Sequence, residues 1–460
     1  MEETVARTFR LSAIASAVLS GLAFLASSWA QSPQPIPGKI LFTDVRVFDG
    51  VHPSLSPATN VLVQGNKIVK ISTAPIPVDR SGLTQIVEGN GRTLMPGLID
   101  AHVHLQLAGL PMMVMITADS GYVQLVAAQT AKGMLMRGFT SVRDMAGETF
   151  GLKRAIDEGL VPGPRIWPSG AMISQTSGHG DFRMPGEVPR VPGAPLSRGE
   201  QLGVGMIADG VDQVLVRSRE QLMLGATQIK LSAGGGVASS YDPLDVSQYT
   251  EAEFHAAVDA AQNWGTYVAV HAYTPKAIQT AIHAGVQCIE HGQLMDEETA
   301  KLMSEKGTWL SAQPFLDDED ANSFPEGSAN RAKQMQMSQG TDTAYRLAKQ
   351  YKLKTAWGTD IVNSPGLLPR QGAMLAKMVR WYTPGEVLVM ATSTNAELLA
   401  LSGPRNPYPG KLGVIEEGAL ADLLMVQGDP IGNIKLVEDP DTNFVIIMKD
   451  GRIFKNSLQR

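Results

Sequence analysis

The sequence is poor in cysteine: Cys288 is the single one among 460 residues. No intramolecular disulfide can form, so the fold must be held together by its apolar core and by any metal ions that it binds. Cys288 lies in the strand-like apolar run of residues 286–290. We therefore expect a buried, inert thiol there rather than a nucleophile.

The sequence also lacks an excess of basic residues. Its 39 lysines and arginines stand against 45 aspartates and glutamates, which gives a formal net charge of −6. Nothing in this balance favours binding to nucleic acid or to an anionic membrane surface. The length suits one large domain with a smaller one, and leaves ample residues for a core.

A long apolar run is confined to the N-terminus. Basic residues precede an apolar segment from Leu11 to about Ala26, and small residues follow up to Ala30. This order is typical of a secretory signal peptide over residues 1–30, cleaved after Ala30. An uncleaved anchor is the alternative, although the run is short and rich in serine for a spanning helix. We expect a periplasmic or secreted protein with no membrane attachment after cleavage.

Both ends of the remaining chain carry strand patterns. The strand-like runs lie at residues 40–42, 45–48, 60–63, 68–71, 421–426, 444–448 and 452–454. The Gly65-Asn66 and Asp450-Gly451 pairs are typical of hairpin turns. Because either end alone has too few strands to bury a core, we predict one composite β-sandwich domain from residues 31–95 and 405–460.

Between these ends, strand-like runs alternate with helical patterns such as residues 251–264, 275–284 and 297–306. Eight such runs occur, at residues 98–104, 139–144, 165–170, 227–231, 267–271, 286–291, 308–312 and 355–360. Their count and spacing favour an α/β fold, a TIM-like (β/α)8 barrel over residues 96–404. A doubly wound open sheet would show the same strands and stays the alternative.

Two connections of this barrel stand out. Residues 171–226 form a long segment rich in glycine and proline, which carries Ser177-Gly178-His179-Gly180-Asp181. Long loops in compact domains are usually functional covers or disordered. The Gly234-Gly235-Gly236 run matches neither spaced glycine motif for phosphate binding, and we expect a flexible loop beside the functional site.

His102 and His104 end an apolar run, separated by one residue. In an extended strand, side chains at i and i+2 point to the same face, so the two imidazoles would aim at a common point. A metal site requires this convergence. Taken alone, the motif is equally well explained as two polar residues at a strand end.

Four more polar residues fall at the ends of later strands: Lys230, His271, His291 and Asp360. In a barrel, the C-terminal strand ends converge on one mouth, where catalysis is found. Singly, the histidines could be satisfied core residues, the aspartate a helix N-cap, and the lysine an ordinary strand-end residue. All four, joined with the two histidines of the first strand, favour a metal centre.

Lys230 lies inside an apolar run, at residues 228–231. Burying an unpaired ammonium costs several kcal/mol. Reaction of the amine with CO₂ would convert it to a carbamate, an anionic ligand whose two oxygens can bridge two cations. We therefore interpret Lys230 as a carboxylated, metal-bridging residue.

The order of His-x-His, strand-four lysine, two histidines and an aspartate, with the flanking β-sandwich, resembles the binuclear amidohydrolase superfamily over essentially all of the mature chain. Residues 177–181, 229–235 and 289–292 look like the imidazolonepropionase-related branch. That branch contains Xaa-Pro dipeptidases and ochratoxin A-hydrolysing amidohydrolases.

The resemblance implies two divalent metal ions, with Zn²⁺ as the expected ion. Carboxylated Lys230 would bridge the two. The other ligands are divided between a more buried ion and a more exposed one: His102, His104 and Asp360 for the first, His271 and His291 for the second. The resemblance also places His179 against the substrate, and offers Tyr241 as a weaker candidate for a carboxylate or oxyanion partner.

These roles describe the hydrolysis of an amide. The metals would lower the pKa of a bridging water, and the resulting hydroxide would attack the scissile carbonyl. Asp360 would take the proton and pass it to the leaving amine, while His179 would steady the carbonyl oxygen. By the resemblance, the substrate releases a C-terminal L-amino acid, as a dipeptide, an N-acyl amino acid or ochratoxin A would.

Other functions use the same scaffold. A cyclic amidohydrolase or a deaminase is one alternative, and a deaminase usually needs one metal and no bridging lysine. A lactonase or organophosphate hydrolase would share both metals, whereas a non-catalytic relative would typically lose ligands that are all present here. Relatives also form homo-oligomers, including octamers, although no stretch of this sequence marks an interface.

Overall fold

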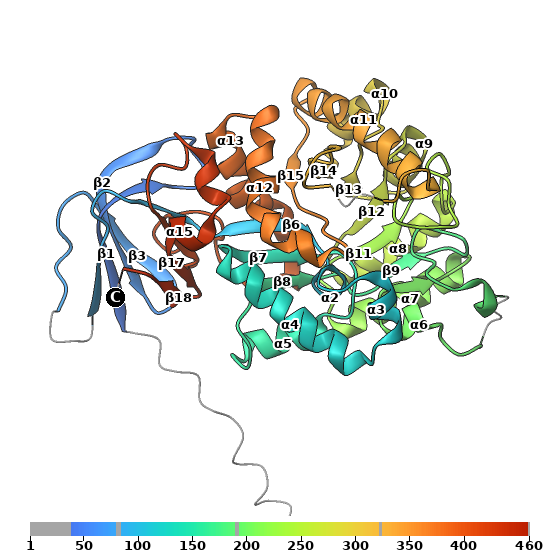
Figure 1. Cartoon of the computed structure of the whole chain (residues 1–460), viewed down its shortest axis with the longest axis horizontal. Coiled ribbons are helices and arrows are strands. Elements are labelled where there is room, and N and C mark those ends of the chain that lie inside the picture. Colours follow the sequence, from blue (N-terminus) through green and yellow to red (C-terminus); the bar gives the residue numbers. More distant parts are fainter. Residues whose placement is uncertain (1–37, 80–83, 189–192, 322–323, 459–460) are drawn as a thin grey trace, which may run out of the picture. The chain divides into compact units, whose positions relative to one another are not determined.

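The computed structural model describes residues 38–79, 84–188, 193–321 and 324–458 (Figure 1). The predicted signal peptide, residues 1–30, lies outside the described residues. Within the described ranges, no helix is both long and apolar enough to cross a bilayer.

Strands from both chain ends form one eight-stranded sheet, which confirms the predicted composite β-domain. Its strands are β1 (Lys39–Phe48), β2 (Leu55–Gln64), β3 (Lys67–Ser72), β4 (Thr84–Glu88), β5 (Thr93–Pro96), β16 (Leu423–Val426), β17 (Phe444–Lys449) and β18 (Arg452–Asn456). β5 joins the two ends, because it pairs with β1 on one side and with β16 on the other. The N-terminal blue strands and the C-terminal red strands therefore lie side by side in Figure 1.

Alternating apolar residues of this sheet explain its packing. Ile40 and Phe42 of β1 share a fully buried cluster with Leu423 and Met425 of β16. Side chains at i and i+2 lie on one face of a strand, so each strand presents one apolar face to this cluster. β4 runs parallel to β1, a pairing that the sequence pattern did not predict. The domain boundaries proposed from the sequence stay a prediction.

The eight predicted barrel strands are all present. They are β6 (Leu98–Val103), β7 (Phe139–Asp144), β8 (Arg165–Pro168), β11 (Ile229–Ser232), β12 (Val268–Ala272), β13 (Cys288–His291), β14 (Trp309–Ala312) and β15 (Thr355–Trp357). Every pairing among them is parallel. Almost all of their side chains are buried, as expected for strands covered by helices on the outside and by packed side chains within.

Regular strand pairing is interrupted at two places around the barrel, and at each place a backbone hydrogen bond joins the neighbouring segments. The Thr227 amide donates to the Pro168 carbonyl at 2.8 Å, which joins β11 to β8. The Asp360 amide donates to the His102 carbonyl at 2.8 Å, which joins the end of β15 to β6. Because the last strand thus neighbours the first, the fold is a TIM-like barrel and not an open doubly wound sheet.

Helices alternate with these strands: α4 (Ser120–Met136), α5 (Phe150–Asp157), α7 (Val211–Leu224), α8 (Glu251–Trp264), α9 (Pro275–His283), α10 (Glu297–Lys306) and α11 (Ala329–Gln350). The predicted helices at 251–264 and 297–306 are confirmed. Their ends follow from local chemistry: Thr250 and Glu253 form a capping box before α8, and Gly265 ends it in the left-handed conformation. Asp296 caps α10 by accepting from the Thr299 amide, and Gly307 ends it in the left-handed conformation.

The long 171–226 segment is more ordered than its composition indicates. It contains β9 (Met172–Ser174), α6 (Arg198–Gln201), β10 (Gly205–Ile207) and the whole of α7. β9 pairs with β11, and β10 pairs with β9, so the segment extends the barrel sheet. Strands of three residues are too short to give a hydrophobic period, so β9 and β10 gave no signal in the sequence. The interpretation of the segment as one long loop was also wrong for α7, which is 14 residues long.

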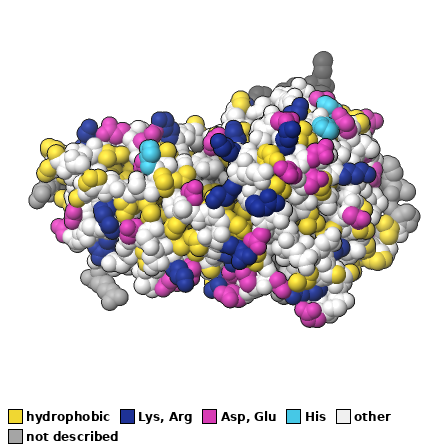
Figure 2. All heavy atoms as spheres, turned by 90° about the horizontal axis from the view of Figure 1, so that it is seen from above, with side chains coloured by type: hydrophobic (Ala, Val, Ile, Leu, Met, Phe, Trp, Pro, Cys, Tyr) yellow, Lys and Arg dark blue, Asp and Glu magenta, His cyan; other side chains and the backbone are white. Residues whose placement is uncertain are grey.

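Charges of both signs lie among one another on the face drawn in Figure 2. Elsewhere on the molecule, charged side chains of opposite sign pair locally, as Lys153 does with Asp157 at 2.6 Å and Arg380 with Asp342 at 2.7 Å. Such exposed pairs contribute about 0–1 kcal/mol each. On this face the molecule therefore shows the mixed surface that the small net charge predicts.

Candidate metal centre

A cavity opens at the C-terminal ends of the barrel strands. Its lining includes the six predicted ligands and one further histidine: His102, His104, His179, Lys230, His271, His291 and Asp360. The barrel topology accounts for this convergence, because parallel strands all end on the same side.

His102 of β6 and His104, which directly follows this strand, point toward one carboxylate. His104 Nε2 lies 2.9 Å from Asp360 Oδ1, and His102 Nε2 lies 3.4 Å from the same oxygen. The two ring centroids are 5.1 Å apart. The i, i+2 spacing therefore places both imidazoles on one side of the strand, as the sequence predicts.

Asp360 follows β15 by three residues, and its φ of 53° lies in the left-handed region. It is not a helix N-cap, since Ser364 occupies that position before the next helical turn. Burial would raise the pKa of Asp360, but the neighbouring His102 and the hydrogen bond from His104 outweigh it and hold the pKa below its usual range. A strained backbone thus aims an anionic group into the cavity.

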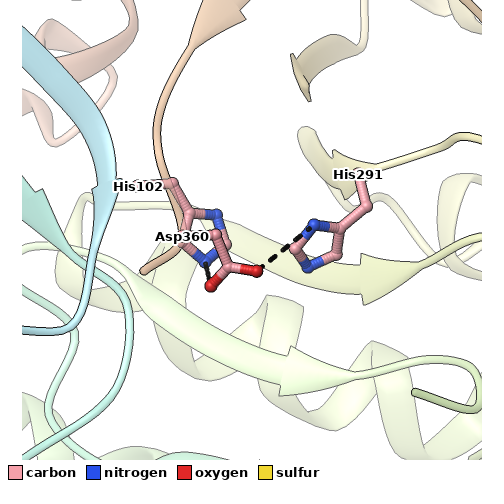
Figure 3. Close-up of side chains that lie close together, drawn as sticks. All are labelled: His102, His291 and Asp360. Atoms are coloured by element: carbon pink, nitrogen blue, oxygen red, sulfur yellow. Dashed lines mark ion pairs between the residues drawn. The ribbon is translucent and has the colours of Figure 1, made fainter. Parts of the chain in front are cut away.

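Donor atoms from three strands come close together at this point. His102, His291 and Asp360 each offer one ligand atom, and these atoms lie within 4.8 Å of one another. Figure 3 shows the Asp360 carboxylate between the two imidazole rings. Among the described residues, His102 Nε2 is buried without a hydrogen-bond partner. An unpaired buried nitrogen beside a carboxylate fits a metal ligand.

Hydrogen bonds behind the rings set which nitrogen of each histidine faces the cavity. His271 Nε2 lies 3.1 Å from the Gly235 carbonyl, and His291 Nδ1 lies 2.7 Å from Gln313 Oε1. Both partners only accept, so these nitrogens carry the proton and the opposite nitrogen keeps its lone pair. Burial lowers the pKa of His291 to about 4 and holds that of His271 well below its usual range, which keeps both imidazoles neutral and able to bind a metal.

Lys230 lies on β11 with its side chain buried below the cavity mouth. No hydrogen bond or ion pair to its ammonium is present among the described residues. Burial lowers the pKa of Lys230, although Glu290 and Asp360 act in the opposite direction. A neutral amine is the form that reacts with CO₂, so this environment suits the predicted carbamate.

A buried ion pair behind His102 escaped the sequence analysis. Arg143 of β7 donates to both carboxylate oxygens of Glu290, at 2.8 and 2.9 Å, and Glu290 Oε2 lies 2.7 Å from His102 Nδ1. Burial would raise the pKa of Glu290, but the Arg143 guanidinium holds it well below its usual range. The carboxylate therefore fixes the His102 tautomer that points Nε2 at the metal site. The feature of the sequence that could have revealed this ion pair is the presence of charged residues within apolar strands.

We predict that Glu290→Gln weakens metal binding by about 10–100-fold, because the amide cannot hold the His102 tautomer as the carboxylate does. Competition with a coloured chelator would measure this loss. Asp422→Asn is the matched control, since it breaks another buried arginine pair, between Asp422 directly before β16 and Arg165 of β8 at 2.8 Å, away from the metal-ligand candidates. That variant should lose stability but keep its metal affinity. Equal affinities in the two variants would contradict the prediction.

His179 lies on the cavity wall, as the sequence analysis expects. Its ring stacks on His271 with centroids 3.9 Å apart, and its Nδ1 lies 2.9 Å from Ser239 Oγ. Burial lowers the pKa of His179 to about 3, so the ring is neutral. Its contact with a substrate stays a prediction.

Tyr241 does not join this group. Its phenol donates to the Arg183 carbonyl at 2.8 Å, and 42% of the residue is exposed. Among the described residues that line the cavity, Tyr241 is absent. The geometry therefore gives no support to a contact between Tyr241 and a substrate carboxylate.

Apolar side chains form most of the remaining wall, including Leu107, Met172, Phe315, Phe324 and Met337. They come from the segments after β6 and β14, from β9 and from α11, so separate parts of the chain build the pocket. A cavity with apolar walls and a cluster of polar groups at its base is typical of a small-molecule site.

Comparison with known proteins agrees with this geometry. Residues 93–454 match the Amidohydrolase family. An ochratoxinase from Aspergillus niger is 33% identical over 414 residues, which cover 86% of this chain and 82% of the relative.

Two crystal structures are similar over nearly all of the chain. One is of an amidohydrolase, with a TM-score of 0.83 and 35% identity over 92% of this chain and 100% of that one. The other is of a prolidase complexed with N-methylphosphonate-L-proline, with a TM-score of 0.83 and 33% identity over 91% of this chain and 100% of that one.

Proposed function

The chain belongs to the amidohydrolase family and is thus a hydrolase acting on amide bonds, and from this premise we propose that it is an exported, binuclear metal enzyme whose substrate releases a C-terminal L-amino acid. The observation that carries the proposal is the cluster of His102, His291 and Asp360, whose ligand atoms lie within 4.8 Å of one another and whose His102 Nε2 is buried without a hydrogen-bond partner. The relatives support the substrate class, because an ochratoxinase and a prolidase are both about one-third identical to the chain.

The proposed ligands divide between two metal ions. His102, His104 and Asp360 would hold one ion, His271 and His291 the other, and Lys230, as its carbamate, both. When bound, two Zn²⁺ ions would lower the pKa of a water molecule and polarise the scissile carbonyl. Carbamate formation joins the neutral Lys230 nitrogen to the carbon of CO₂ and releases one proton.

Side chains of this protein would then transfer the proton and bind the substrate. Asp360 is anionic and lies within the ligand cluster, so it can take a proton from the attacking water and deliver it to the nitrogen of the leaving amine. His179 faces the cavity from the 171–226 segment, where it would contact the carbonyl oxygen. The apolar walls would take up the acyl group and exclude bulk water.

The test is a substrate panel with metal-loaded protein. We expect free amino acid to be released from N-acyl amino acids, Xaa-Pro dipeptides or ochratoxin A. Removing the metal with a chelator should abolish the release, and Zn²⁺ should restore it. Two equivalents of metal per chain should accompany activity.

The same panel separates the alternatives. Hydrolysis of lactones or phosphotriesters without release of any amino acid would overturn the proposed substrate class. One equivalent of metal together with ammonia release would instead identify a deaminase.

A further inference from the structure

Residues 234–242, here called the glycine loop, follow β11 and border the cavity. The sequence pattern predicts a flexible loop, but the described structure shows one that touches two histidines. The Gly235 carbonyl accepts from His271 Nε2 at 3.1 Å. A methyl group on Gly236 would lie 1.8 Å from His179 Nδ1, so the His179 ring packs directly on the loop backbone.

The loop also supplies the polar partners of His179. Ser239 Oγ lies 2.9 Å from His179 Nδ1 and 3.2 Å from the Gly236 carbonyl. Gln248, just beyond the loop, accepts from the His179 amide at 3.0 Å and donates to Asp242 Oδ2 at 3.2 Å. Asp242 in turn accepts from the Gly236 amide at 2.8 Å, which closes the loop on itself. The place of His179 therefore depends on the conformation of the loop.

Two residues of α11 hold this loop from outside. Lys333 Nζ donates to three of its carbonyls, those of Gly236 at 3.0 Å, Ser239 at 2.9 Å and Asp242 at 2.6 Å. Asn330 Nδ2 donates to the Val237 carbonyl at 2.6 Å and to the Ser239 carbonyl at 3.2 Å. The Lys333 side chain is only 16% exposed, so these bonds are largely shielded from water. Hydrogen bonds from a charged donor are stronger than those between neutral groups.

The helix that bears these residues is itself fixed to other barrel loops. Gly340 of α11 packs against the Gln293 carbonyl, which a methyl group at Gly340 would approach to 2.2 Å. Thr341 Oγ1 donates to the Phe315 carbonyl at 2.7 Å. α11 thus ties the glycine loop to the segments that follow β13 and β14, and Met337 of the same helix lines the cavity.

We propose that Lys333 and Asn330 are positioning residues, which hold the His179 ring at the cavity through the glycine loop and Ser239. The functional part of this inference rests on the proposed amide hydrolysis, in which His179 contacts the substrate. Lys333 acts only through the loop carbonyls, and it is not a catalytic residue.

Lys333→Met tests the inference, because it keeps the apolar stem and removes the three donated bonds. Amide hydrogen exchange in residues 234–242 should become faster by about tenfold or more, with the rest of the barrel unchanged. The value of kcat/KM for amide hydrolysis should fall about tenfold, while metal content stays at the wild-type level. In a His179→Gln background, Lys333→Met should cause no further decrease in kcat/KM, as expected when one residue acts through the other.

Two further variants serve as controls. Lys349→Met removes a lysine of the same helix that donates to the Trp381 carbonyl at 2.7 Å, and it should leave both exchange and activity unchanged. Ser239→Ala should reproduce the kinetic defect without loosening the loop, and Ser239→Thr should restore activity because it keeps the hydroxyl.

The outcomes separate this inference from the proposed function. Unchanged exchange in residues 234–242 of Lys333→Met, or losses that simply add in the His179→Gln background, would overturn the positioning role. If Lys333→Met shows faster exchange in the glycine loop but the wild-type protein hydrolyses no amide, the contact of α11 with the loop is supported. The proposed function is then overturned.

Discussion

An Asp360→Asn variant should lose about 10²–10⁴-fold in kcat for amide hydrolysis, even when metal is supplied in excess. The substitution keeps the size of the side chain but removes the anion that His102 and His104 surround at 3.4 and 2.9 Å. An amide at this position cannot accept a proton from water near neutral pH. The loss should therefore appear in kcat, with a smaller decrease in metal affinity from the lost negative charge.

Steady-state kinetics and metal analysis of the same samples would check this result. Asp320→Asn is the matched control, because Asp320 also lines the cavity but is paired with Arg370 at 2.6 Å and Lys377 at 2.9 Å. That variant should keep its full metal content and lose far less in kcat. Wild-type kcat in a metal-saturated Asp360→Asn protein would show that another group moves the proton.

The sequence predicted that these side chains converge, because their geometry follows from local rules. Parallel strands end on one side of a barrel, so residues such as His271 and Asp360 converge whatever the details of packing. The i, i+2 rule fixed the relation of His102 to His104. These inferences need only the strand positions, which apolar runs and glycine breaks reveal.

The contacts behind the ligands could not be predicted in the same way. Arg143 and Glu290 are 147 positions apart in the chain, and their pairing depends on which side chains point into the barrel interior. The three bonds from Lys333 to the glycine loop span more than 90 positions. No local pattern encodes such pairs, since a charged residue in a strand or helix can equally face solvent.

Tyr241 is the reverse case: the residue lies in a segment that borders the cavity, but its side chain does not reach the cavity. Its backbone carbonyl accepts from Ser177 Oγ at 3.2 Å, and its phenol bonds to the Arg183 carbonyl instead of reaching the cavity. The direction of a loop side chain depends on such tertiary bonds, which sequence spacing does not determine.

Lys230→Met should remove most of the bound metal and lower kcat/KM by on the order of 10³-fold, as expected when the several kcal/mol that metal ions supply to catalysis are lost. Methionine fills nearly the same volume but can form no carbamate. Because the buried ammonium has no hydrogen-bond partner among the described residues, the metal-free variant should be at least as stable as the metal-free wild type. The combination of lost metal and retained thermal stability would distinguish a bridging ligand from a structural lysine.

Lys449→Met provides the matched comparison. Lys449, on β17 of the β-domain, is also a buried lysine, but it donates to the Gly163 carbonyl at 2.7 Å. Its removal leaves an unsatisfied carbonyl, so stability should fall while metal content stays unchanged. Labelling with ¹³C-bicarbonate should give a carbamate signal in the wild type and in Lys449→Met, but none in Lys230→Met. If Lys230→Met kept both metal equivalents, the His and Asp side chains alone would hold the ions, and burial of the Lys230 amine would need another explanation.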